Sequence, residues 1–436
     1  METLTLFLFC FVLILFISLG FPIVVALFTG LVIFFIYGFY QHFSFAQILQ
    51  MCIDGIKEAG NIIITMLIIG ILTAMWRASG TISMIIVYAG YFIKPSIFLF
   101  MSFLLNCIVS FLLGTSFGTA ATMGVICATM ASTMDIPVVL AGGAVLSGVF
   151  FGDRCSPLST SAILVSEVTH SDLYVNIKNM FKTAIVPFVV TSLLFLVIGF
   201  VTPHKSINMD LRVIFGKEFN LAWFLLIPAV LILGLSAFRV KVKCAMIASI
   251  FSAIPICLFF QHIGIVELCK IALFGFKASN GEVGKMLNGG GLLSMINVVF
   301  VLCISSSYSG FFQKTQLLSK LKAGIKRLSE KITNFGALVA TSFLASAIAC
   351  NQTLAIILTN QLCKDLEKDN SKMAINLENS VVMIAGLIPW SIAGAVPLAS
   401  IGAPLSSLFF GFYLYLIPLW RLIVELFNKN KKNNLE

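Results

Sequence analysis

One carboxylate is the strongest candidate for chemistry in this chain. Asp153 directly follows the apolar run 137–152, and Pro157, which breaks helices, comes four residues later. A carboxylate in such a run is costly unless it is paired, hydrated or bound to a cation. We therefore expect Asp153 to bind a cation such as Na⁺, in competition with a proton. Adjacent Arg154 is its expected gating and charge partner in transport. The alternative is a purely structural one, in which Arg154 only neutralises the Asp153 carboxylate.

Hydroxyl and amide side chains near Asp153, and in two other polar interruptions, are candidates for the remaining ligands. Hard cations prefer carboxylate, hydroxyl and carbonyl oxygens. For each of these residues taken alone, helix packing or a hydrogen bond to the preceding helical turn is the competing explanation. The candidates are Ser156, Ser159, Thr160, Thr115, Ser116, Thr119, Asn351 and Gln352.

Three further candidates have an equally strong structural explanation. Glu378 is either a membrane acid or a residue in the first turn of a helix, where a carboxylate is favoured by the positive end of the dipole. Trp76 and Trp390 either line and gate a cavity or pack in the core and at the membrane interface.

The cysteines form no C-x-x-C pair and are typical of small buried hydrophobes, so we expect no cofactor.

The composition defines the class of protein that must position these residues. Of 436 residues, 59% are apolar and only 11% are charged. A soluble domain carries about 25% charged residues. Apolar runs of about 20 residues, the length of a spanning helix, predict ten to twelve transmembrane helices. The sequence thus predicts an all-α polytopic membrane protein.

The net charge of +10 sits in basic clusters between the apolar runs rather than on a nucleic-acid-binding face. Lys and Arg near helix ends favour the cytoplasmic side. This rule places 239–243, 313–331 and the C-terminal tail in the cytoplasm. The spans 244–262 and 291–312 then form a pair, and 264–276 must not cross the membrane.

Polar and small residues interrupt the apolar runs at three places in each half, with corresponding interruptions 230 to 236 residues apart. Broken helices are tolerated in lipid only beside a cavity or buried in protein. Paired interruptions indicate two inverted repeats with a midplane binding site, and the alternative is close helix packing through small residues. The interruptions are 76–81, 114–119, 152–160, 305–310, 349–353 and 387–391.

The repeats suggest how the chain is organised. We expect N-terminal helices, a first transporter repeat, a polar linker, a second transporter repeat and a basic cytoplasmic tail. These parts are expected at 1–59, 60–201, 202–218, 219–420 and 421–436.

Several motifs resemble those of the NhaC-type sodium/proton antiporters, which belong to a broader superfamily of bacterial ion transporters. The resemblance runs in order from about residue 60 to 410, and G-T-x-[WF]-G-T together with G-D-[KR]-x-S-P-L-S is its most specific part. It is carried by IIGILTAMWRASGTI (68–82), GTSFGTAATMG (114–124), AGGAVLSGVFFGDRCSPLSTSA (141–162), SDLYVNIKNM (171–180), NQTLAIIL (351–358) and LENSVVMIAGLIPWSIAG (377–394).

The resemblance implies a multi-pass transporter of the bacterial cytoplasmic membrane that exchanges Na⁺ for H⁺, with Asp153 as the coupling carboxylate. We expect no enzymatic activity, since no P-loop and no buried Ser–His pair is present. The expected partners are Na⁺, H⁺ and the lipid bilayer, without nucleic acid, and a homodimer is one possible assembly.

The chain departs from the family pattern where the family usually has an acid. Thr160, Asn351 and Asn379 occupy such positions. Either Asp153 alone couples the ions, or the transported solute differs. The alternative function is Na⁺- or H⁺-coupled transport of amino acids or small organic acids, with Arg154 or the ends of broken helices binding a carboxylate.

Overall fold

A computed structural model describes residues 2–433 of the chain, except 20, 93, 158, 203–210, 239, 316–328, 330 and 331. Within these residues the chain is helical, and its only β-pairing is an isolated bridge between Phe276 and Gly289. The expected all-α class is confirmed. Most of the predicted linker 202–218 and of the basic loop 313–331 lies outside the described residues.

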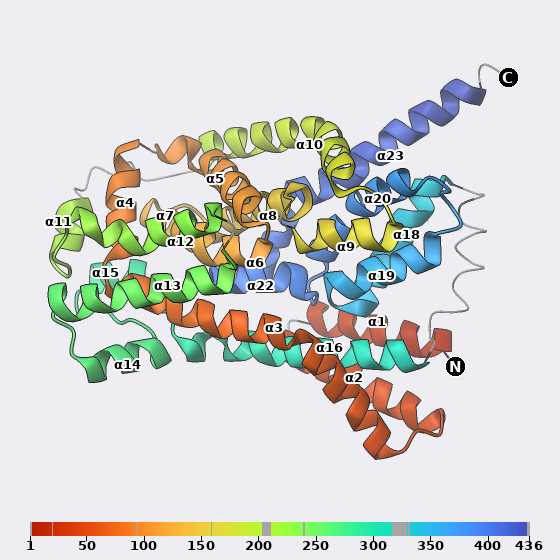
Figure 1. Cartoon of the computed structure of the whole chain (residues 1–436), viewed down its shortest axis with the longest axis horizontal. Coiled ribbons are helices and arrows are strands. Elements are labelled where there is room, and N and C mark those ends of the chain that lie inside the picture. The colour runs from red at the N-terminus through yellow and green to blue at the C-terminus, as the bar shows by residue number, and fades with distance from the viewer. Residues whose placement is uncertain are drawn as a thin grey trace.

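The α-helices, and the short 3₁₀ or π segments labelled η, follow one another along the chain (Figure 1). Their bounds are α1 (Glu2–Ser18), α2 (Ile23–Tyr40), α3 (Phe45–Ala78), α4 (Thr81–Phe92), η1 (Pro95–Ile97), α5 (Phe98–Leu113), α6 (Ser116–Thr119), η2 (Ala120–Gly124), α7 (Val125–Thr133), α8 (Val138–Cys155), α9 (Thr160–Thr169), α10 (Leu173–Val201), α11 (Leu211–Gly216), η3 (Trp223–Leu226), α12 (Ile227–Ala237), α13 (Val242–Pro255), η4 (Ile256–Phe260), α14 (Ile265–Phe274), α15 (Gly281–Leu287), η5 (Leu292–Met295), α16 (Ile296–Thr315), α18 (Asn334–Ala349), α19 (Gln352–Cys363), α20 (Asn370–Glu378), α21 (Val381–Ile384), η6 (Ala385–Leu387), α22 (Ile392–Ser400), η7 (Leu405–Phe410) and α23 (Phe412–Asn433).

Several of these helices are long and apolar enough to cross a membrane. Among the described residues four qualify singly, and up to six qualify if each bent pair counts as one span. The expected ten to twelve crossings stay a prediction, because many expected spans are built from shorter, broken helices. The four are Pro95–Leu113, Val138–Cys155, Leu173–Val201 and Lys243–Phe260, and the bent pairs are Phe45–Lys57 with Ile62–Ala78 and Asn370–Leu387 with Ile392–Ser400.

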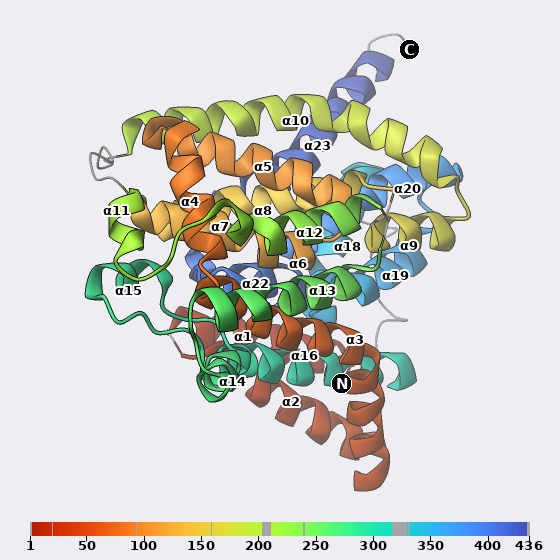
Figure 2. The same ribbon diagram turned by 60° about the vertical axis from the view of Figure 1, so that its left-hand side comes forward.

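Helix α10 shows how the chain meets lipid. It runs along one side of the molecule beside α5 and α23 (Figures 1 and 2). Its buried residues recur every three or four positions, as in Ala184, Pro187 and Thr191. Its outward positions are also apolar, and Leu193 and Val197 are 54% and 58% exposed. An apolar outer face fits contact with lipid rather than water, so the chain is a polytopic membrane protein.

Five of the six predicted interruptions coincide with helix ends. Short non-helical segments separate α3 from α4, α5 from α6, α8 from α9, α18 from α19 and η6 from α22. The prediction of a break at 305–310 is wrong, because α16 continues through this segment.

The small residues of 305–310 instead allow two helices to pack closely. Helices α3 and α16 lie side by side in both views (Figures 1 and 2). A Cβ added to Gly310 would lie 1.9 Å from the carbonyl oxygen of Met51, and one added to Gly55 would lie 2.1 Å from that of Ser306. The packing explanation therefore holds at this place.

The structure also bears on segment 264–276 and on the predicted boundaries of the parts of the chain. Segment 264–276 contains α14, which has only 10 residues, too few to cross a bilayer. Helix α3 passes through the predicted boundary at residue 59, and α23 continues through Asn433 into the predicted tail. The division into repeats stays a prediction.

Candidate functional site

Two of the breaks have the same backbone geometry, 236 residues apart. Gly114 ends α5 with φ 66° and ψ 25°, and Cys350 ends α18 with φ 58° and ψ 0°, both left-handed. Thr115 (φ −151°, ψ 131°) and Asn351 (φ −141°, ψ 152°) follow in extended conformation. The next helix starts at the following residue in each case. Equal geometry at equal spacing supports a duplicated unit.

The carboxylate of Asp153 lies between the two helix starts that follow these breaks. Asp153 is 3% exposed and belongs to the last turn of α8, which continues to Cys155 instead of unwinding at residue 152. Its Oδ2 accepts a hydrogen bond from Nε2 of Gln352 at 3.1 Å. The backbone amide of Ser116 also interacts with this carboxylate. Ser116 and Gln352 are the first residues of α6 and α19, and helix N-termini favour negative charge.

The end of α8 is fixed in place by close contact with α5. The amide of Gly152 donates to Oγ of Ser110 at 3.0 Å, and that hydroxyl donates to the carbonyl of Gly148 at 2.9 Å. A Cβ added to Gly152 would lie 2.0 Å from the carbonyl carbon of Ser110. Only glycine permits this approach, which positions the following Asp153.

The serine hydroxyls near Asp153 hold its main chain rather than its carboxylate. Ser159 and Ser161 both donate to the carbonyl oxygen of Asp153, the latter at 2.6 Å. Ser156 donates to the carbonyl of Phe111 at 2.7 Å and ties the end of α8 to α5. Thr160 is exposed at the start of α9, and the structure does not bring it to the carboxylate.

The polar residues of the two matching breaks are used within the backbone. Thr119 donates to the carbonyl of Thr115 at 2.8 Å, which is the back-bonding alternative. Asn351 caps α19, accepting from the amide of Leu354 at 2.8 Å, and its Nδ2 donates to the carbonyl of Ala349 at 3.3 Å. These hydrogen bonds fix the backbone at the breaks. None of them joins Thr119 or Asn351 to the Asp153 carboxylate.

Arg154 does not pair with Asp153 in this structure. Its guanidinium is buried, and its hydrogen bonds within the described part of the chain go to neutral groups. Nη2 donates to Asn379 Oδ1 at 2.5 Å and to Thr183 Oγ1 at 2.7 Å. Nη1 donates to the carbonyl of Met180 at 3.2 Å.

Nη1 of Arg154 also lies 3.5 Å from the hydroxyl of Tyr413 on α23. Sequence reasoning missed Thr183 and Tyr413 as partners of this arginine. No local pattern could have found them, because they come from α10 and α23. The sequence did point to Asn379, because this residue stands where the family that the chain resembles usually has an acid.

Glu378 is a second buried carboxylate near Asp153 and Arg154, whose charges both act on it. Its side chain has no exposed surface, and neither oxygen has a hydrogen-bond partner among the described residues. The alternative that it starts a helix is wrong. It is the last residue of α20, which begins at Asn370 with Asp369 as its cap.

Both candidate tryptophans pack between helices. Nε1 of Trp76 on α3 donates to Oγ of Ser249 on α13 at 2.8 Å. Nε1 of Trp390 donates to the carbonyl of Ala347 at 2.7 Å and ties the 388–391 break to α18. Both rings are buried, at 2% and 5% exposure, as the packing explanation requires.

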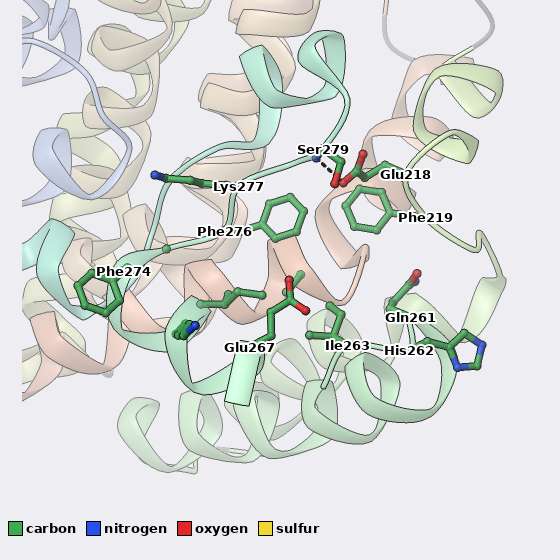
Figure 3. A pocket seen from close by; sticks show the side chains of 14 residues that line it. Glu218, Phe219, Gln261, His262, Ile263, Glu267, Phe274, Phe276, Lys277 and Ser279 are labelled. Atoms are coloured by element: carbon green, nitrogen blue, oxygen red, sulfur yellow. Dashed lines mark hydrogen bonds between the residues drawn. The ribbon is translucent and has the colours of Figure 1, made fainter. Parts of the chain in front are cut away.

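An open pocket of about 480 Å³ lies elsewhere, between α14, the end of α3 and the chain after α11 (Figure 3). Glu218 on its wall accepts hydrogen bonds from the amides of Ser279 at 2.7 Å and Asn280 at 2.9 Å. None of the candidate site residues predicted from the sequence lines this pocket.

Comparison with known proteins identifies the family. The model of the Na⁺/H⁺ antiporter family matches residues 3–166 and 148–427. The Na(+)/H(+) antiporter NhaC of Bacillus subtilis is 31% identical over 402 residues, covering 89% of this chain and 88% of the relative. The malate-2H(+)/Na(+)-lactate antiporter of the same organism is 30% identical, covering 86% of this chain and 82% of the relative.

A more distant relative is named for organic solutes. The arginine/ornithine antiporter ArcD of Halobacterium salinarum is 27% identical, over 81% of this chain and 76% of its own length. The family match covers most of the chain, and the NhaC relative is above 30% identity at high coverage. The chain therefore belongs to the Na⁺/H⁺ antiporter family.

Proposed function

We propose that this protein is a secondary active transporter that exchanges Na⁺ for H⁺ across the cytoplasmic membrane, with Asp153 binding the two ions alternately. The observation that carries the proposal is the buried Asp153 carboxylate held by Gln352 at the meeting of two broken helices. Family membership and the NhaC-named relatives support the same exchange, and they favour a transporter over an enzyme.

The surroundings of Asp153 suit an exchange of cations. Two helix N-termini stabilise its negative charge, so the carboxylate is an attractive site for one positive charge. A proton and Na⁺ each neutralise that charge, and they bind the same oxygens. Binding of one therefore displaces the other, which is the coupling that antiport requires.

The relatives named for lactate or arginine keep transport of a small organic solute as the alternative. The structure weakens the part offered for Arg154 in it. Both terminal nitrogens of this guanidinium already donate hydrogen bonds to the protein. A solute carboxylate would instead have to bind at the N-termini of α6 and α19, where Asp153 already lies.

Everted membrane vesicles test the proposal. Vesicles with the wild-type protein should dissipate a preformed pH gradient when Na⁺ is added, and Asp153→Asn should abolish this response. Asp172→Asn is the matched control, because Asp172 is exposed and caps α10 through Oδ1, which asparagine also supplies. Equal Na⁺ responses in wild type and Asp153→Asn would contradict the role of Asp153.

The same preparation separates the alternative. Uptake of labelled amino acids and dicarboxylates into proteoliposomes, driven by a Na⁺ or H⁺ gradient, should be absent under the main proposal. Uptake that requires Asp153 while Na⁺ alone moves no protons would favour the alternative. The mass of the purified protein in detergent tests the expected homodimer.

A further inference from the structure

We propose that Glu378 is a second proton-binding carboxyl of the exchange cycle, distinct from the cation site at Asp153. This inference rests on the proposed Na⁺/H⁺ exchange and adds a proton to it. Glu378 is completely buried at the end of α20, and neither of its oxygens has a hydrogen-bond partner within the described chain. An ionised carboxylate in such a position pays a large desolvation penalty, and a protonated one pays far less.

The two buried acids have opposite surroundings. The Asp153 carboxylate accepts a hydrogen bond from Gln352 and meets the amide of Ser116 at a helix start. The Glu378 carboxyl accepts no hydrogen bond in the described structure. Paired acids in contrasting environments take different roles, one ionised and one protonated. This contrast assigns the cation to Asp153 and a bound proton to Glu378.

Arg154 provides the means to stabilise Glu378 after its proton leaves. The Arg154 charge acts on Glu378. Nε of Arg154 is buried without an acceptor, while its terminal nitrogens are held by Asn379 and other neutral groups. An unpaired charged donor and an unpaired carboxyl thus lie in the same part of the fold, because Asn379, which follows Glu378 in the chain, binds the Arg154 guanidinium. When Glu378 releases its proton to one side of the membrane, its carboxylate can accept from Nε.

Other titratable or charged groups also face this cluster. On α8 they are Asp153, which repels an ionised Glu378, and the thiol of Cys155. On α23 they are Tyr413, which contacts Arg154, and Arg421, which reaches α20 through Asn376. Release of the Glu378 proton is easier when Na⁺ occupies Asp153 than when Asp153 is ionised and empty, because the bound cation removes the repulsion between the two carboxylates. Proton release from Glu378 is therefore coupled to Na⁺ binding.

Counting protons released per bound Na⁺ tests this assignment without requiring turnover. Purified protein in weakly buffered detergent receives Na⁺, a pH indicator reports released protons, and radioactive sodium reports binding. Glu378→Gln should release one proton fewer per Na⁺ than wild type, and Glu378→Asp should restore it. Glu167→Gln, an exposed acid on α9, is the matched control and should match wild type.

The outcomes separate the two proposals. An unchanged proton count in folded Glu378→Gln, with normal Na⁺ binding, would overturn the role of Glu378 and leave Na⁺/H⁺ exchange intact. A wild-type protein that releases no protons on Na⁺ addition and dissipates no pH gradient would overturn both. If Glu378→Gln does not fold, the pH dependence of the proton count in Glu378→Asp decides. A shorter acid that carries the proton should shift the pH range over which the second proton is released, and an unchanged pH dependence would overturn the role of Glu378.

Discussion

Gln352 donates a hydrogen bond from Nε2 to Oδ2 of Asp153 over 3.1 Å, although the two residues are 199 positions apart in the chain. The same Nε2 donates to the carbonyl of Val382 at 3.1 Å. One amide thus joins the acid at the end of α8 to both α19 and α21. A change that separates these helices must break a hydrogen bond to the carboxylate.

Replacing Gln352 with methionine removes that hydrogen bond while keeping the side-chain length. A hydrogen bond to a charged group contributes about 1.5–3 kcal/mol. Without it the carboxylate holds its proton more tightly, so proton competition should lower the apparent Na⁺ affinity about tenfold or more. The pH of half-maximal exchange should rise, because the ionised carboxylate loses a donor. Titration of Na⁺ in everted vesicles measures both effects.

The control for this change lies on the same helix. Gln361 on α19 is exposed, so Gln361→Met should leave the Na⁺ response unchanged. If Gln352→Met kept the wild-type Na⁺ affinity, the contact with Asp153 would have no part in cation binding.

Asn379 determines where the Arg154 guanidinium rests. Asn379→Leu removes the oxygen 2.5 Å from Nη2 and leaves a buried charge with one acceptor fewer. The variant should lose about 1.5–3 kcal/mol of stability. Asn379→Asp keeps the oxygen and adds an ion pair with Arg154. It should therefore be at least as stable as the wild type, whereas the leucine variant should not. Thermal unfolding of the purified variants measures this, and equal melting temperatures for both would contradict it.

Gly152 should tolerate no side chain. Gly152→Ala places a Cβ 2.0 Å from the carbonyl carbon of Ser110, and such overpacking costs about 1–3 kcal/mol or more. Because Asp153 follows directly, Na⁺-dependent proton movement should also fall. Gly234→Ala is the control, since no heavy atom lies within 4 Å of its added Cβ. A Gly152→Ala protein with full stability and activity would argue against the tight α5–α8 contact.

Asn351 is predicted to act as a helix cap. Asn351→Ala should lower stability by about 1 kcal/mol, while Asn351→Ser and Asn351→Asp should keep it, since both still accept from the α19 amides. Melting temperatures and Na⁺ response, measured together, distinguish the roles. A serine variant with normal stability but no Na⁺ response would mean that Asn351 contacts the ion.

Much of the site follows from local sequence. Five breaks were predictable because Gly, Pro and capping residues mark places where helices end, as Gly114, Ser159 and Ser391 do here. Asp153 was predictable because a lone acid in an apolar run requires a reason. Both signals depend only on the nearest residues in the chain.

The errors came from features that depend on tertiary contacts. The small residues of 305–310 break no helix, because Gly310 serves contact with α3. The Thr119 hydroxyl bonds to the carbonyl of Thr115 in the preceding turn, which is a local contact and the alternative left open by the sequence. The partners of Arg154 come from α10, α20 and α23, and no local spacing predicts which helices meet. The sequence therefore predicted where polar residues interrupt the helices more reliably than it predicted which groups their side chains contact.

The matching backbone of the two breaks has a consequence for how such proteins diversify. The left-handed residue followed by an extended one recurs with Gly114 in the first half and Cys350 in the second. The shape therefore survives a change of side chain at the same position. Main-chain geometry of this kind can stay constant while neighbouring side chains change. We expect substitutions beside the breaks to change the bound ion or solute while the chain still folds, because the backbone of the breaks does not depend on one particular side chain.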